Sequence, residues 1–204
     1  MKILHIDSSI LGSYSVSRTL SSEIVDREVA LHPGAEVVYR DLTTDPALHL
    51  SSAHMAAWQG APVENAALGA DLKTGGDYLA EVFAADIIVI GAPMYNFSVP
   101  SQLKAWIDRI VVAGQTFKYS ETGELQTLIP PKKKIVIAST RGNVYEPGTP
   151  KAALEHHESY LSGVFSFLGL HDVTIVRAEG LAFGPEAKDA AIAKARTDIA
   201  AIAA

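Results

Sequence analysis

Apolar residues recur along the chain in short runs rich in Ile and Val, and longer segments with helical spacing of apolar positions separate them. The runs predict five β-strands, at residues 3–6, 36–40, 87–91, 135–139 and 173–177. The intervening and final segments predict helices at residues 17–31, 66–84, 101–112, 151–168 and 185–202. Strands and helices that alternate in this way are typical of βαβ units, in which the strands are parallel.

The character of the runs predicts where each strand lies in the sheet. The runs at 87–90 and 135–138 are apolar throughout, as expected of central strands covered by helices on both faces. The run at 36–40 is flanked by charge, which favours an edge position. Because βαβ crossovers are right-handed, the helices divide between the two faces. We therefore expect an α/β three-layer sandwich with a five-stranded parallel sheet of order 2-1-3-4-5.

Two segments lie outside this alternation, residues 42–63 and residues 115–131. In the second, Thr116-Phe117-Lys118-Tyr119 and Gly123 predict a hairpin. Insertions of this length in a compact domain usually have a function. The chain shows neither an internal repeat nor a linker, so we expect one domain over residues 1–204 with these two insertions.

Composition and charge exclude several classes of protein. The formal net charge is -6, with 17 basic and 23 acidic residues, which argues against nucleic-acid binding. The absence of cysteine excludes disulfides, thiolate catalysis and iron–sulfur clusters. No apolar stretch approaches the roughly 20 residues that span a bilayer, so we expect a soluble, cytoplasmic protein with no membrane contact. The basic cluster Lys132-Lys133-Lys134 is interpreted as a solvated loop before a strand.

In a parallel sheet with this strand order, ligands bind at the carboxyl ends of the strands, between strands 1 and 3. Residues 7–18 follow strand 1 and hold five serines and a glycine before a helix begins. Hydroxyls and free amides at a helix N-terminus form a phosphate cradle. The segment lacks GxxxxGK[ST] and GxGxxG, so it predicts a single phosphate monoester. Alternatively, Ser15 or Ser17 is only an N-cap.

The loops after strands 3 and 4 add a second kind of contact. Strand 3 leads into Pro93-Met94-Tyr95-Asn96-Phe97, where thioether and aromatic side chains have little core to fill. These side chains favour a flat ligand. Strand 4 leads into Ser139-Thr140-Arg141-Gly142-Asn143, whose amides could reach the polar edge of a ring, or which is a plain turn. The three loops together predict a flat phosphorylated ligand.

With these motifs the chain resembles the FMN-dependent NADH-azoreductases, which are members of the flavodoxin-like quinone reductases. The resemblance is carried by Ser8-Ser9, Ser15-Val16-Ser17, Ala92-Pro93-Met94-Tyr95-Asn96-Phe97, Gln102-Leu103-Lys104, Thr116-Phe117-Lys118-Tyr119, Ala178-Glu179-Gly180 and Gly184-Pro185-Glu186. It implies a flavodoxin-like fold and a homodimer with FMN near the interface. It also implies two-electron transfer from NADH or NADPH to quinones and azo compounds by a ping-pong mechanism.

The resemblance also implies roles for particular residues. Ser9, Ser15, Val16 and Ser17 would hold the phosphate and ribityl chain of FMN, and Pro93, Met94, Tyr95, Asn96 and Phe97 would border the isoalloxazine. The turn of Ser139, Thr140, Arg141, Gly142 and Asn143 would contact the polar edge of the ring. Asn143 departs from the second glycine of the family's Ser-Arg-Gly-Gly, and Tyr145 stands where some relatives have histidine. The hydride chemistry belongs to FMN, so no side chain is assigned as catalytic.

Aromatic residues elsewhere are candidates for the walls of the substrate site. They are Phe117 and Tyr119 in the second insertion, Trp58 in the first, and Phe165 or Phe167 in the helix at 151–168. Core packing is the alternative for Phe165 and Phe167. His156, His157 and Glu158 resemble metal ligands, but adjacent helical residues point about 100° apart, so we expect a surface helix and no metal.

Other functions share some of these features. A flavodoxin-type electron carrier would have the same fold, although such carriers usually dock through a strongly acidic face. A flavin reductase would release its reduced cofactor to a partner. A scaffold that binds a phosphate ester without any flavin is the third alternative.

Overall fold

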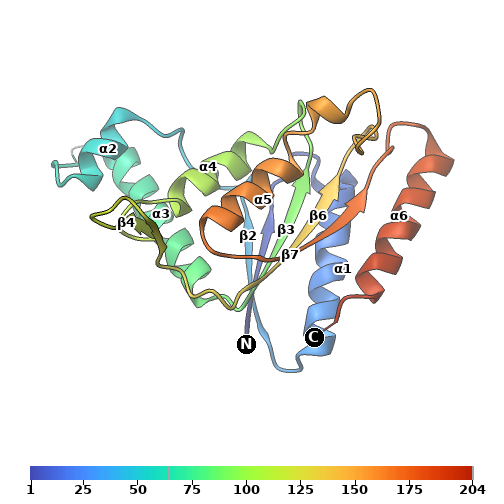
Figure 1. Ribbon diagram of the computed structural model, residues 1–204, viewed down its shortest axis with the longest axis horizontal. Helices are drawn as coiled ribbons and strands as arrows, with labels where there is room; N and C mark the ends of the chain where they lie inside the picture. Colours follow the sequence, from blue (N-terminus) through green and yellow to red (C-terminus); the bar gives the residue numbers. More distant parts are fainter. Residues whose placement is uncertain (64, 204) are drawn as a thin grey trace.

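The computed structural model of the protein describes residues 1–63 and 65–203; residues 64 and 204, included in the expected domain, lie outside them. Five parallel strands form one sheet in the order β2-β1-β3-β6-β7 (Figure 1). Their bounds are β1 (Lys2–Asp7), β2 (Glu36–Asp41), β3 (Ile87–Pro93), β6 (Lys134–Thr140) and β7 (Asp172–Ala178). The predicted order 2-1-3-4-5 is confirmed, because these are the first to fifth strands of the sheet along the chain.

Helices cover both faces of the sheet, as Figure 1 shows. One face carries α1 (Val16–Leu31) and α6 (Pro185–Ala200), and the other carries α3 (Ala66–Ala84), α4 (Ser101–Ile110) and α5 (Glu158–Phe167). Side chains of β3 alternate between two cores: Ile88 and Ile90 pack under α3 and α4, and Ile87 and Val89 pack under α1. The alternation follows from the two-residue period of a strand. All of β3 is buried, which confirms its central position.

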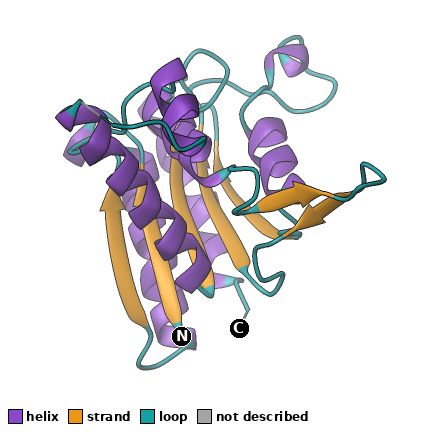
Figure 2. Cartoon of the chain, turned by 90° about the vertical axis from the view of Figure 1, so that its left-hand side faces the viewer, coloured by secondary structure: helices purple, strands orange, loops and turns teal. Residues whose placement is uncertain are grey.

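The two insertions hold elements of their own. Residues 42–63 contain α2 (Ser52–Trp58), and residues 115–131 contain the antiparallel hairpin of β4 (Phe117–Tyr119) and β5 (Leu125–Thr127). The hairpin was predicted, and Figure 2 shows it extending away from the sheet. Its base is fixed to the end of α5, where the rings of Phe117 and Phe167 are 4.8 Å apart in an edge-on arrangement. The hairpin therefore has a defined position although its tip is exposed.

The predicted helix at 151–168 was wrong in its first half. A short 3-10 helix, η2 (Ala152–Leu154), is followed by a break, and α5 begins only at Glu158. The break occurs because the carboxylate of Glu155 accepts hydrogen bonds from the backbone amides of His157, Glu158 and Ser159 and so caps the start of α5. The expected surface character was also wrong for His157 and Glu158, which are buried, whereas His156 is exposed.

The interpretation of the basic cluster as a solvated loop was wrong for Lys133, which is 4% exposed. Its ammonium group donates hydrogen bonds to the backbone carbonyls of Phe83 and Ala85 at the end of α3. These carbonyls have no partner within the helix, so the cation satisfies them and complements the helix dipole. Lys134 pairs with the buried Glu28 at 2.9 Å. Across the part of the chain that is described, no helix combines the length and the apolar composition needed to cross a membrane.

Candidate functional site

A cavity of about 230 Å³ lies at the carboxyl ends of β1, β3 and β6. It is lined by Ser9, Leu11, Tyr14, Ser15, Val16, Pro93, Met94, Tyr95, Thr140, Arg141, Gly142, Leu181 and Lys188. The three loops that the sequence singled out therefore meet in one space. Of the predicted residues, five lie within two positions of a lining residue but do not line the cavity themselves: Ser17, Asn96, Phe97, Ser139 and Asn143.

The serine loop leads into α1 through a short 3-10 helix, η1 (Gly12–Tyr14). Ser15 is the N-cap of α1, because its hydroxyl accepts a hydrogen bond from the amide of Arg18 at 3.3 Å. Ser17 contributes a hydroxyl 3.0 Å from that of Ser15. The amides of Val16 and Ser17, at the first turn, find no acceptor among the described residues. The first turn of α1 thus has two amides without an acceptor beside a pair of bonded hydroxyls, although Ser17 itself is 0% exposed. An anion is the kind of ligand that such a turn suits.

The loops after β1 and β3 are joined through one side chain. The hydroxyl of Tyr95 lies 3.1 Å from that of Ser9 and accepts a hydrogen bond from the amide of Ile10 at 3.2 Å. Close approach of the two strand ends depends on Gly91. A Cβ at this position would lie 2.3 Å from the carboxylate of Asp7 and 3.3 Å from the backbone carbonyl of Ser17.

The segment after β3 turns back on itself in a strained conformation. Tyr95 and Ser98 exchange backbone hydrogen bonds of 3.0 and 3.1 Å, and the two residues between them, Asn96 and Phe97, have φ of 47° and 72°. They are the only non-glycine residues with positive φ in the described chain. A bulky residue is rarely found in this region, and such strain is concentrated at functional sites. The turn leaves Phe97 42% exposed at the edge of the site.

The turn after β6 is held by backbone hydrogen bonds on both sides. Arg141 donates its amide to Ala178 at 2.9 Å, and Gly142 accepts from Ala182 at 3.0 Å. The side-chain oxygen of Asn143 accepts from Lys151 at 2.8 Å. This residue therefore fits the turn without glycine at its position. Met94 donates its amide to Thr140 at 2.8 Å, which fixes the turn against the loop after β3.

Behind this turn lies a buried ionic cluster that the sequence did not indicate. The carboxylate of Glu158 pairs with Arg141 and accepts hydrogen bonds from Arg177 at 2.9 and 2.6 Å. Burial by itself would raise the pKa of Glu158, but the two guanidinium groups outweigh burial and lower the pKa to about 2. Burial also lowers the pKa of the neighbouring His157 to about 4. Arg141 is therefore held by a permanent counter-ion.

A second ion pair, also missed, supports the serine loop. The guanidinium of Arg18 donates to the backbone carbonyl of Ser9 at 3.1 and 2.9 Å and to the carboxylate of Asp41 at 2.8 Å. Hydrogen bonding to Arg18 lowers the pKa of Asp41 to about 2. Asp41 is the last residue of the edge strand β2, 23 positions from Arg18. No local sequence pattern therefore indicated that the two residues pair. The pair holds the Ser9 loop at the end of the sheet.

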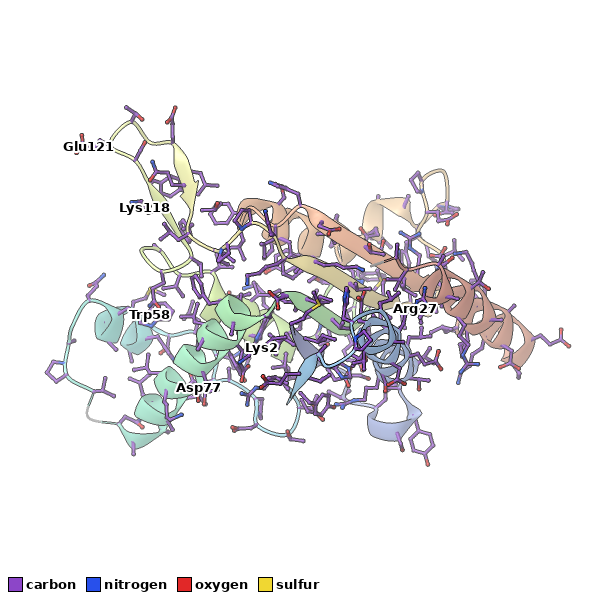
Figure 3. The ribbon with its side chains drawn as sticks, turned by 90° about the horizontal axis from the view of Figure 1, so that it is seen from below. Lys2, Arg27, Trp58, Asp77, Lys118 and Glu121 are labelled. Atoms are coloured by element: carbon purple, nitrogen blue, oxygen red, sulfur yellow. The ribbon has the colours of Figure 1, made fainter. Side chains whose placement is uncertain are left out.

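The predicted substrate walls lie elsewhere in the chain. Phe117 and Tyr119 are on the hairpin, with ring centroids 5.9 Å apart, and Phe167 packs against Phe117. Trp58 lines a separate cavity of about 280 Å³ with α3 and α4. Figure 3 shows Trp58 and the hairpin residue Lys118 on the same side of the molecule. None of the four aromatic residues lines the cavity at Ser9, and Phe165 is 0% exposed in the core.

The lining of the cavity fits a flat phosphorylated ligand. Amides and hydroxyls occur at one part, Pro93, Met94 and Tyr95 offer apolar surface, and no acidic side chain is among the lining residues. Leu11, Tyr14, Leu181 and Lys188 also line it and were missed by the sequence analysis. Within the described residues no group of three or more His, Asp or Glu could hold a metal ion. The strand order and this site, at the reversal point of the sheet, define a protein of the flavodoxin-like class.

Comparison with known proteins supports this class and narrows it. A family model described as flavodoxin-like fold matches residues 1–203. The FMN-dependent NADH:quinone oxidoreductase 2 of Bradyrhizobium diazoefficiens is 52% identical over 195 residues, which cover 96% of this chain and 95% of that protein. The corresponding protein of Rhizobium meliloti is 50% identical over 200 residues, covering 98% and 96%. The crystal structure of an azoreductase from Bacillus anthracis aligns with a TM-score of 0.86 at 26% identity, covering 98% of this chain and 97% of that one. The chain belongs to the FMN-dependent NADH:quinone oxidoreductase family.

Proposed function

We propose that the protein is an FMN-dependent NADH:quinone oxidoreductase that also accepts azo compounds. The function follows from relatives of this name at 50–52% identity over nearly the whole chain. The observation in the molecule that supports it is the cavity where the start of α1, the loop after β3 and the turn after β6 meet. The cavity offers anion donors and an apolar face to one ligand.

Each part of the cavity suits one part of FMN. We assign the amides of Val16 and Ser17 and the hydroxyls of Ser9 and Ser15 to the phosphate and ribityl chain. Pro93, Met94, Tyr95, Asn96 and Phe97 would border the isoalloxazine, and Ser139, Thr140, Arg141, Gly142 and Asn143 would form the turn at its polar edge. Because Glu158 neutralises Arg141, this turn would present mainly backbone dipoles to the ring.

When bound, FMN supplies the hydride chemistry, and the chain supplies position and electrostatics. The net reaction takes NADH, a proton and a quinone to NAD⁺ and the hydroquinone. No carboxylate or imidazole is among the residues that line the cavity, so we assign the proton to solvent. Donor and acceptor would use the same open face in turn, which is the basis for a ping-pong order.

We further propose a homodimer. The first insertion exposes five large apolar side chains by 37–45%: Leu48, Leu50, Met55, Trp58 and Val63. Exposed apolar groups gathered on one segment are typical of a protein interface. A second copy of the chain on this surface would bury them. It would also bring Trp58 and the hairpin residues Phe117 and Tyr119, together with Phe167, toward the site of the partner.

The activity is tested by following NADH loss with the purified protein. We expect bound FMN, slow NADH oxidation alone, and fast oxidation when a quinone is added. A protein that takes up no FMN would refute the proposal. A protein that binds FMN but oxidises NADH equally slowly with and without quinone would be an electron carrier. Rapid NADH oxidation with release of the cofactor would indicate a flavin reductase.

The oligomeric state is tested by light scattering on the holoprotein. We expect twice the mass of the 21.7 kDa chain. Met55→Glu places a charge on the proposed interface and should shift the protein toward monomer with loss of quinone reduction. Val37→Glu is the matched control, because Val37 is similarly exposed, at 40%, on the edge strand β2. A wild-type monomer with full activity would overturn the dimer.

A further inference from the structure

A phosphate monoester carries close to two negative charges near neutral pH, but the serine cradle contains no cation. Three basic side chains lie close to it. Arg141 and Lys188 line the cavity, and Arg18 holds the Ser9 loop from behind. Whether one of these side chains is free to pair with a phosphate depends on whether a carboxylate already neutralises it. This question rests on the proposed function, since it takes FMN as the ligand.

Arg18 is already neutralised. Its Nη1 and Nη2 atoms donate to the two carboxylate oxygens of Asp41 at 2.8 Å each, and Nε and Nη2 donate to the carbonyl of Ser9. A further hydrogen bond of 3.0 Å reaches the hydroxyl of Tyr39. Every nitrogen of the guanidinium therefore has an acceptor, and its charge is balanced by Asp41.

Arg141 is neutralised in the same way. It is 3% exposed and pairs with Glu158, whose lowered pKa of about 2 keeps the carboxylate charged at any physiological pH. Arg177 shares the same carboxylate. Removing Arg141 from this cluster to reach a phosphate would leave Glu158 with a single partner, which is unfavourable in a buried site.

Lys188 differs from both arginines. Its side chain lines the cavity, and its ammonium group makes no ion pair with any described carboxylate. The positions three and four residues away, which share its side of the helix, are Gly184, Pro185, Ala191 and Ile192. Asp189 and Glu186 are near in sequence, but residues one and two positions away do not face it, and neither pairs with it. The cation is therefore available to a ligand.

The packing of α6 beside α1 places Lys188 at the level of the cradle. Arg196 of α6 pairs with Glu23 of α1, at a sequence separation of 173, and Arg27 donates to the carbonyl of Ile202 at a separation of 175. These contacts show two helices side by side that run in the same direction, as Figure 1 shows. A separation of 173 also relates Lys188 to Ser15, about two turns earlier on each helix.

We infer that Lys188 is the counter-charge for the phosphate group of FMN, and that it makes the site prefer FMN to riboflavin. The serine hydroxyls and helix amides give direction to the anion, and the ammonium group adds charge from the neighbouring helix. A lysine suits this role because its long stem lets a compact cation approach the phosphate from an exposed helix.

The inference is tested by titrating the apoprotein with FMN and with riboflavin, followed by quenching of flavin fluorescence. Lys188→Met keeps the stem and removes the charge. It should raise the Kd for FMN by roughly three- to tenfold at low salt and leave the Kd for riboflavin unchanged. Lys194→Met is the matched control, because Lys194 is an exposed residue of the same helix that pairs with Asp198. It should change neither value.

Two further measurements separate a charge effect from a structural one. Lys188→Arg should restore most of the FMN affinity. The difference between wild type and Lys188→Met should shrink as the ionic strength rises to about 1 M, where the screening length falls to about 3 Å. Equal Kd values for FMN in wild type and Lys188→Met, or equal weakening of FMN and riboflavin, would overturn the inference while the proposed function stands. A wild-type protein that binds no FMN would overturn both.

Discussion

The hydroxyl groups of Ser9 and Tyr95 are hydrogen-bonded at 3.1 Å, although the two residues are 86 positions apart in the chain. The bond joins the loop that begins the phosphate cradle to the loop that would border the flavin ring. The same tyrosine hydroxyl accepts the amide of Ile10. One side chain therefore sets the distance between the two halves of the proposed cofactor site.

Tyr95→Phe removes this connection and keeps the ring. We expect the Kd for FMN to rise by about three- to tenfold, which corresponds to the roughly 1 kcal/mol typical of one hydrogen bond. Fluorescence titration of the apoprotein measures the change. Tyr119→Phe, on the hairpin, is the control and should leave the Kd unaltered. An unchanged Kd in Tyr95→Phe would show that the loops keep their spacing without the bond.

Gly91→Ala and Gly76→Ala should change stability in opposite directions. At Gly91 a Cβ would meet the carboxylate of Asp7 at 2.3 Å, so we expect the free energy of unfolding to fall by about 1–3 kcal/mol. At Gly76, inside α3, a Cβ meets nothing within 4 Å, and alanine should add up to about 1 kcal/mol. Urea denaturation measures both. A stabilised Gly91→Ala protein would contradict the close approach of β1 and β3.

The pair of Arg18 and Asp41 should show energetic coupling. Arg18→Met leaves a partly buried carboxylate without its cation and should destabilise the protein by about 1–3 kcal/mol. In the double variant with Asp41→Asn, part of this loss should be recovered, with a coupling energy of about 1–2 kcal/mol. The four proteins of this cycle are compared by urea denaturation. Additive effects would mean that the two side chains contribute independently.

His157 should make the protein sensitive to acid. Its folded pKa of about 4 lies below the ordinary histidine value of 6.5, so between these two pH values the unfolded chain binds a proton that the folded chain does not. Stability is therefore complete above pH 6.5 and declines as the pH falls from 6.5 toward 4, by up to about 3 kcal/mol.

The measurement is the free energy of unfolding at several pH values between 4 and 7. His157→Leu should flatten the dependence in this window, whatever its effect at pH 7. His156→Leu, the exposed neighbour, should keep the wild-type slope. Equal slopes in all three proteins would assign the acid sensitivity to other groups.

Much of the fold could be predicted because its strands differ in pattern. The apolar runs at 87–90 and 135–138 could only be covered on both faces, and the charged run at 36–40 could only be an edge. The site followed from the same logic, because loops after parallel strands meet at one end of the sheet. The prediction failed at the start of α5 because the Glu155 side chain caps amides two to four residues further on, which the spacing of apolar positions does not reveal. It failed at Lys133 because that residue is buried by a long-range contact with the end of α3.

Several residues at the site were missed because their partners are distant in the sequence. Arg18, Asp41, Glu158 and Arg177 appear along the chain as ordinary surface charges, and only the folded structure brings them into pairs. Lys188 lies in a helix whose predicted role was to cover the sheet. The aromatic residues proposed as substrate walls were recognised by type, yet within one chain they lie apart from the cavity.

The turn of Tyr95 to Ser98 closes through its own two backbone hydrogen bonds, with Asn96 and Phe97 already in their left-handed conformations. The shape of this turn is thus held by contacts within the turn itself. Little conformational entropy remains to be lost on association, so more of the contact energy appears as affinity. The cost of the two left-handed residues is met by the folding of the chain and would not have to be met again by a ligand.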